Sequence, residues 1–145
     1  MWRKIFSLLV ICIAFVGVSN FSEAALIKVE GVGFFNHPPL FGAKDAIIKV
    51  CEEFGDKVEF TLYMEDDEDG QQFMKEKNLS GHIPMALFIN GSMAHQLGVR
   101  TVVFRDFIGR YWTEEDLRQV VEFNVSRTST AIAAPENAYS GFYKP

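Results

Sequence analysis

Residues 80–91 read SGHIPMALFING and carry the most specific fold signal in the chain. Pro84 to Ile89 is apolar throughout, as expected for a strand that is buried on both faces of a sheet. Asn90-Gly91, directly after it, is the strongest short sequence signal for a tight hairpin turn. The stretch therefore predicts a central strand that ends in a hairpin, with Ser92 to Leu97 returning as the next strand.

The residues before this stretch alternate between strand and helix patterns. Leu26 to Phe35 and Val58 to Met64 are rich in β-branched and apolar residues and predict two strands. Leu40 to Phe54, between them, places its apolar residues on one helical stripe. A shorter helix is expected from about Gln71 to Lys77. This order favours a parallel strand pair joined by a right-handed crossover.

The residues after the stretch predict one more helix and a tail. Arg100 to Ile108 is expected either to extend the sheet or to form a loop. Thr113-Glu114-Glu115-Asp116 resembles a capping box and would start the last helix. Residues 126–145 have no period and are expected to form a flexible tail. The fold class is α/β, with one domain at residues 25–125 and helices on both faces of a mixed sheet.

Residues 1–24 have the layout of a secretory signal peptide. Arg3 and Lys4 precede an almost unbroken apolar run from Ile5 to Val18, and small residues follow at Ser22 and Ala24. The run is shorter than the ~20 residues needed to span a bilayer. The sequence therefore predicts a periplasmic or extracellular protein without stable membrane insertion after signal cleavage.

Charge and cysteine usage exclude some classes of function. The net charge of −5 disfavours nucleic acid as a partner, because binding to phosphates needs a basic face. Of the two cysteines, Cys12 would leave with the signal peptide, so the remaining chain could form no internal disulfide. Cys51 falls on the apolar helical stripe and is expected to be a buried core residue; a redox-sensing thiol is the alternative.

Together, the order of elements and residues 80–91 resemble the thioredoxin-like superfamily, over about Ile27 to Phe123. The resemblance implies a three-layer thioredoxin-like sandwich with a central mixed sheet of about four to five strands, and a cis peptide bond at Pro84. It places the family's Cys-x-x-Cys motif on His37-Pro38-Pro39-Leu40 and the family's buried aspartate on Gly31. Disulfide exchange needs an activated thiolate and a second thiol. The resemblance therefore implies a redox-inactive protein.

The resemblance also implies a binding groove, because the loop at 37–40 and the proline loop are neighbours in the family. Phe104 to Trp112 would border this groove, and its mixture of aromatic and arginine residues is typical of binding hot spots. The alternative is that Phe104, Phe107 and Trp112 complete the core. The candidate groove residues are His37, Pro38, Pro39, Leu40, His82, Ile83, Pro84, Phe104, Phe107, Arg110 and Trp112.

Two metal sites can be considered. His37 and His82 would supply only two ligands, whereas zinc sites use three or four. The acidic run after the second strand has nearly the spacing of an EF-hand calcium loop, with Gly70 at its turn. Its candidate ligands are Glu65, Asp67, Asp69 and Glu76. A solvated acidic turn before a helix is the preferred interpretation, so no metal, cofactor or catalytic residue is predicted.

The sequence favours a binding or chaperone-like module for a protein or an extended peptide, which would pair with backbone beside Pro84 by strand addition. One alternative is a thiol-disulfide or one-cysteine redox enzyme that uses Cys51. Another is a structural subunit of an envelope assembly.

Overall fold

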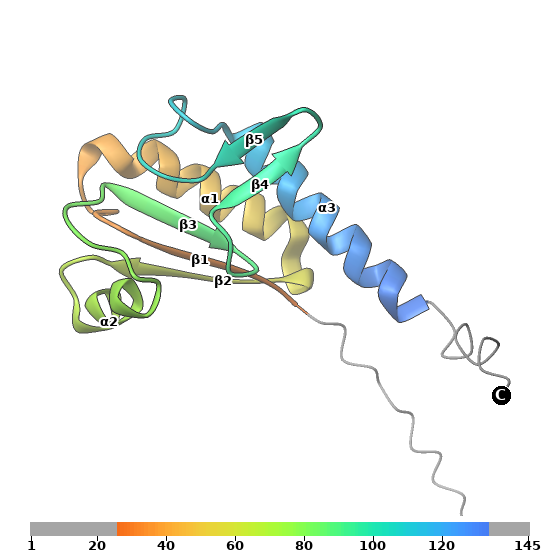
Figure 1. The fold of residues 1–145 in the computed structure, drawn as a ribbon, viewed down its shortest axis with the longest axis horizontal. Helices are drawn as coiled ribbons and strands as arrows, with labels where there is room; N and C mark the ends of the chain where they lie inside the picture. The colour runs from red at the N-terminus through yellow and green to blue at the C-terminus, as the bar shows by residue number, and fades with distance from the viewer. Residues whose placement is uncertain (1–25, 134–145) are drawn as a thin grey trace, which may run out of the picture.

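The computed structural model describes residues 26–133, and the chain is drawn in Figure 1. The strands β1 (Ile27–Gly33), β2 (Val58–Met64) and β3 (Met85–Ile89) form a mixed sheet in the order β2-β1-β3. β1 is parallel to β2 and antiparallel to β3, so it is the central strand. The signal peptide predicted at 1–24 lies outside the described residues, as do residues 134–145.

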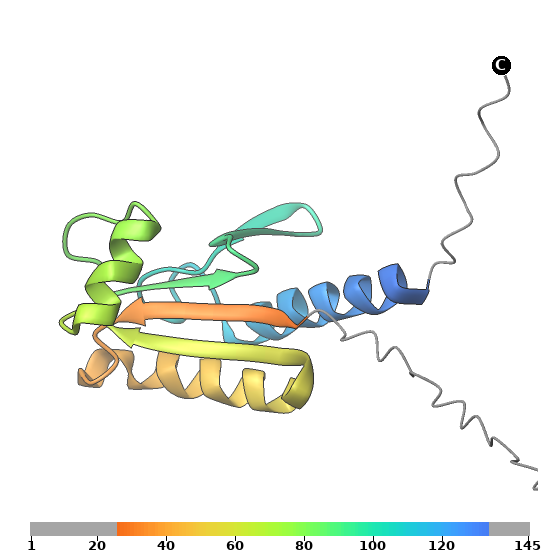
Figure 2. The same cartoon turned by 90° about the horizontal axis from the view of Figure 1, so that it is seen from below.

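Helices cover both faces of this sheet. The helices are α1 (Phe41–Phe54), α2 (Glu68–Glu76) and α3 (Glu114–Ala133), and the 3-10 turns η1 (Pro38–Leu40) and η2 (Gly55–Lys57) flank α1. Figure 2 shows α2 above the sheet and α1 below it. None of the helices within residues 26–133 combines the length and the hydropathy of a bilayer-crossing segment. The expected α/β class with helices on both faces is confirmed.

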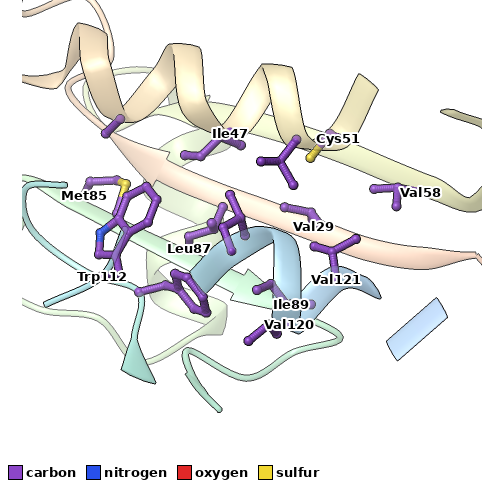
Figure 3. Close-up of a cluster of buried hydrophobic side chains, with 14 of the residues drawn as sticks. Val29, Ile47, Cys51, Val58, Met85, Leu87, Ile89, Trp112, Val120 and Val121 are labelled. Carbon is purple, nitrogen blue, oxygen red and sulfur yellow. The ribbon is translucent and has the colours of Figure 1, made fainter. Parts of the chain in front are cut away.

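Two hydrophobic cores lie between the sheet and the helices, one on each face of the sheet. The strand β3 contributes side chains to both cores. Met85, Leu87 and Ile89 face α1 and α3, whereas Ala86 and Phe88 face α2. Figure 3 shows the larger core, where Ile47 and Cys51 from α1 meet the β1 and β3 side chains together with Val120 and Val121 from α3. All five residues of β3 are buried, so the predicted two-sided burial of this strand is confirmed.

The sheet is smaller than expected, because the strands after the hairpin turn form a separate pair. β4 (Ala94–Leu97) and β5 (Arg100–Val103) pair only with each other. The Asn90-Gly91 turn is present, with φ of 48° and 80°, and Ile89 and Ser92 exchange backbone hydrogen bonds of 2.9 and 3.2 Å across it. Positive φ at both positions is what this turn type requires.

The physical reason for this difference is that another segment occupies the free edge of β3. The Leu87 amide donates to the Phe104 carbonyl, and the Asp106 amide donates to the Met85 carbonyl, both at 2.9 Å. Residues 104–106 therefore take the place that was predicted for Ser92 to Leu97. The expected central sheet of four to five strands is corrected to three strands and a neighbouring two-stranded sheet.

Two helix boundaries also differ from those expected. α2 begins at Glu68 rather than near Gln71, because the acidic Glu68 and Asp69 are favourable in a first helical turn. α3 continues to Ala133, so the tail expected from residue 126 starts with a helical segment. The capping box is present: the Asp116 amide donates to Thr113 Oγ1 at 3.2 Å, and the Thr113 amide donates to Asp116 Oδ2 at 2.9 Å.

We predict that Gly70→Ala destabilises the protein by about 3 kcal/mol or more, as expected for a clash in a packed interior. Gly70 lies in α2, and a Cβ there would clash with the Met64 carbonyl oxygen and carbon. Backbone must therefore shift to admit a methyl group.

Gly42→Ala in α1 is the matched control. A Cβ at Gly42 would lie 3.8 Å from Ile108 Cγ2, which is an ordinary contact. Alanine should be neutral there, or stabilising by up to about 1 kcal/mol because of its higher helix propensity. Urea denaturation measures both variants; equal stabilities would contradict the close packing of α2 on β2.

Candidate functional site

Two loops that are distant in sequence meet around the ring of Phe34. This ring lies 5.1 Å from the ring of His37 and 4.9 Å from the ring of His82, measured between centroids. The Phe34 amide also donates a 3.2 Å hydrogen bond to the Pro84 carbonyl. The structure therefore brings the segment after β1 beside the proline loop, at one end of the sheet.

The family resemblance implies a cis peptide bond at Pro84, but the structure has a trans bond there. All peptide bonds in residues 26–133 are trans. A trans bond is the lower-energy isomer before proline, and the Pro84 carbonyl already has its partner in Phe34. The cis expectation is therefore wrong, although the proline loop lies beside His37 as expected.

A groove of about 280 Å³ lies beside the proline loop. Its wall and floor come from the segment after α2, from β3, from the turn after β3 and from the segment after β5. The lining residues are Leu79, Ser80, His82, Ile83, Ala86, Met93, Arg105 and Asp106. Leu79, Ile83 and Met93 are partly buried against the smaller core and give the groove an apolar surface.

The backbone along this groove has unused hydrogen-bonding groups. Leu79 donates its amide to Met74 at 2.8 Å, and Pro84 accepts from Phe34. Between them, residues 80–83 make no backbone–backbone hydrogen bond within the described part of the chain. Exposed amide and carbonyl groups need water or a ligand as partners, so this segment can accept an extended chain.

Several candidate groove residues belong to the core instead. Leu40, Phe104 and Trp112 are at most 2 % exposed. Phe104 and Trp112 pack edge to face, with their ring centroids 5.6 Å apart. The alternative of a core role, which was left open for Phe104, Phe107 and Trp112, is correct for Phe104 and Trp112 and wrong for Phe107, which is exposed.

Apart from His82 and Ile83, the remaining candidates do not line the groove. His37, Pro38 and Pro39 are exposed in and before η1, whereas Phe107 and Arg110 are exposed in the loop after β5. Of all the candidates, His82 and Ile83 line the groove itself. Sequence reasoning missed Arg105 and Asp106, although both lie in the aromatic and arginine-containing stretch that was singled out.

Glu65 is a buried carboxylate next to this site. It is 8 % exposed, and its Oε2 atom is buried without a hydrogen-bond partner among residues 26–133. Its backbone amide donates to the Gly33 carbonyl at 3.1 Å, which holds it where β1 and β2 end. Burial raises the pKa of the Glu65 carboxyl; the positive charge of His82 opposes this rise in pKa, and Asp66 adds to it.

The acidic run does not form a calcium loop. Asp69 and Gly70 lie within α2, and Glu76 accepts a hydrogen bond from the Gln72 side chain at 2.8 Å. Across residues 26–133, no three His, Cys, Asp or Glu side chains are placed to bind one metal ion. The EF-hand spacing at Glu65, Asp67, Asp69 and Glu76 is therefore not realised in the fold, because α2 starts before Gly70.

Cys51 lies in the main core, far along α1 from its N-terminal end. Its side chain is 1 % exposed, and Figure 3 shows it among apolar residues. Burial, with a smaller effect of Glu52, raises the pKa of the Cys51 thiol to about 12. A thiol in this environment is a poor nucleophile, because the reactive species is the thiolate.

We predict that Cys51 in the native protein resists thiol reagents at pH 8. In a Cys12→Ser variant, a disulfide reagent should modify Cys51 at least about 100-fold more slowly in the folded than in the unfolded protein, since burial suppresses the thiolate. The absorbance of the released thiol reports the rate. Rapid stoichiometric labelling without denaturant would contradict the buried placement.

We predict that Glu65→Met stabilises the protein at pH 7 by about 1 kcal/mol or more, because it removes a buried unsatisfied oxygen. The pKa of Glu65 is raised in the folded state, so its stabilising contribution is complete below the unfolded pKa and is lost as pH rises through the folded pKa. The gain of the variant over the unmodified protein should therefore be smaller at pH 4 than at pH 7.

Glu59→Met is the control for this experiment, because Glu59 is exposed on β2, the strand that directly precedes Glu65. Its effect should stay within about 0.5 kcal/mol, as is usual for surface substitutions. Denaturant titrations at pH 4 and pH 7 measure both variants. A Glu65→Met protein that is less stable than the unmodified protein at pH 7 would show that the carboxylate has a favourable partner.

Comparison of the chain with protein-family models, with curated proteins and with solved structures found no match in any of the three. The function is therefore inferred from the geometry of the groove, and the resemblance to the thioredoxin-like superfamily remains a proposal.

Proposed function

We propose that the protein is an exported, redox-inactive, thioredoxin-like module that binds an extended peptide or an unfolded protein segment, as a chaperone-like protein would. The observation that carries the proposal is the backbone of residues 80–83, which makes no backbone–backbone hydrogen bond within residues 26–133 and runs along a groove of about 280 Å³ lined by Ser80, His82 and Ile83. A peptide strand laid along it would satisfy amide and carbonyl groups on both chains.

The chemistry of the groove fits an extended peptide better than a small polar ligand. Its apolar surface comes from Leu79, Ile83 and Met93, each of them only partly buried. Alternate side chains of an extended peptide point to the same side, so they can contact this surface while the peptide backbone pairs with residues 80–83. Affinity would then come mainly from the main chain, which makes binding tolerant of sequence.

The environment of the thiol argues for binding without redox chemistry. Cys51, the one free cysteine among the described residues, is buried and has a raised pKa. The position where the resemblance would place a redox motif holds exposed His37, Pro38 and Pro39 and buried Leu40. None of these side chains can form a mixed disulfide, which disfavours the alternative of a one-cysteine redox enzyme.

The test uses a fluorescein-labelled peptide of about eight residues, roughly 26 Å long when extended, that alternates leucine with threonine. We predict that Ile83→Asp weakens binding of this peptide at least about tenfold, because it places a charge on the apolar wall of the groove. Fluorescence anisotropy titration measures the dissociation constant for each variant.

Val99→Asp is the matched control, because Val99 is fully exposed at the turn between β4 and β5 and does not line the groove. It should leave the dissociation constant unchanged. A peptide with N-methylated backbone amides should bind more weakly than its parent, since strand addition needs those donors. Equal binding to the Ile83→Asp and unmodified proteins would overturn the proposed groove.

A further inference from the structure

Two arginines share one tyrosine at the rim of the groove. The guanidinium carbon of Arg105 lies 5.3 Å from the centroid of the Tyr111 ring, and that of Arg110 lies 5.0 Å from it. Tyr111 is 42 % exposed, so both cations are held at the surface of the protein. Stacking on an aromatic face orients a guanidinium without using its hydrogen-bond donors.

Most of the donors on these two arginines have no partner among the described residues. Arg105 donates from Nε to Asp106 Oδ2 at 3.2 Å, which leaves its Nη atoms without a partner in residues 26–133. Arg110 makes no ion pair or side-chain hydrogen bond within the same range. By contrast, Arg118 pairs with three glutamates and Arg100 pairs with Asp116.

The position of these cations connects them to the groove. Arg105 and Asp106 line it together with His82 and Ile83. The Asp106 amide is bonded to the Met85 carbonyl at 2.9 Å, so the backbone that carries Arg105 is fixed to the edge of β3. An anchored guanidinium with free donors beside an apolar groove is complementary to a ligand that combines apolar groups with a carboxylate.

Building on the proposed function, we propose that the occupant of the groove is an extended peptide that presents a carboxylate to Arg105 and Arg110. The carboxylate can belong to an acidic side chain or to the C-terminus of the peptide. Either source offers two oxygens to the planar donor fork of an arginine, which recognises this group in bidentate geometry. The chain itself carries a net charge of −5, so this patch is a local exception that would select acidic ligands.

The experiment compares four labelled peptides of one apolar, alternating sequence. They carry glutamate or glutamine at one central position and end in a free carboxylate or a carboxamide. We expect at least one of the two carboxylates to improve the dissociation constant about tenfold, with the advantage falling when salt is raised to about 0.5 M. If the gain in affinity is lost with the carboxamide peptide, the carboxylate that binds is the C-terminus. If it is lost with the glutamine peptide, the carboxylate that binds is the glutamate side chain.

Arg110→Gln should reduce this carboxylate advantage while the fully neutral peptide binds as before, because Arg110 does not line the groove. Arg105→Gln should also reduce the advantage. Arg127→Gln is the matched control, because Arg127 is also stacked on an exposed aromatic residue, Phe123, at 5.5 Å, but lies on α3 away from the groove. Arg110→Lys keeps the charge without the fork and should retain part of the advantage.

The outcomes separate this inference from the proposed function. Equal binding of all four peptides to the unmodified protein would overturn the carboxylate preference and leave peptide binding in place. A carboxylate advantage that persists in the Arg105→Gln, Arg110→Gln double variant would also overturn it. Failure of every peptide to bind would overturn the proposed function itself.

Discussion

The site depends on the close approach of the end of β1 to the proline loop. The Phe34 amide bonds to the Pro84 carbonyl at 3.2 Å, and a Cβ on Gly33 would lie 2.6 Å from that same oxygen. Only glycine allows two backbones to approach this closely. The contact brings His37 and His82, which lie on two different loops, to the same aromatic ring of Phe34. It also sets the course of residues 80–83 along the groove.

A second constraint acts at the other edge of β3. Residues 104–106 occupy this edge, so the chain after the Asn90-Gly91 turn must leave the sheet and form β4 and β5 as a separate pair. The same pairing fixes Arg105 and Asp106 at the groove. Arg105 and Asp106 therefore form the polar wall of the groove because the chain does not continue as a simple hairpin. Leu79, Ile83 and Met93 form its apolar surface.

The low reactivity expected of the Cys51 thiol follows from its packing. Cys51 belongs to the cluster between the sheet, α1 and α3, where burial disfavours its thiolate. The buried Glu65 shows the same effect on a carboxylate at the end of β2, where its neighbours do not fully compensate for the loss of water. Sequence patterns give no warning of this burial, because Glu65 begins an acidic run that otherwise faces solvent.

Local sequence alone determined the elements whose signals are short-ranged. The uninterrupted apolar run of β3, the Asn90-Gly91 turn and the capping box at Thr113 each depend on neighbouring residues, and each is present. Tertiary structure decided what depends on distant partners: which segment pairs with β3, whether Phe104 and Trp112 are core or surface, and that Arg105 joins His82 at one groove. The physical reason is that the free energy of strand pairing and burial comes from contacts across the fold, and a local pattern is compatible with more than one such partner.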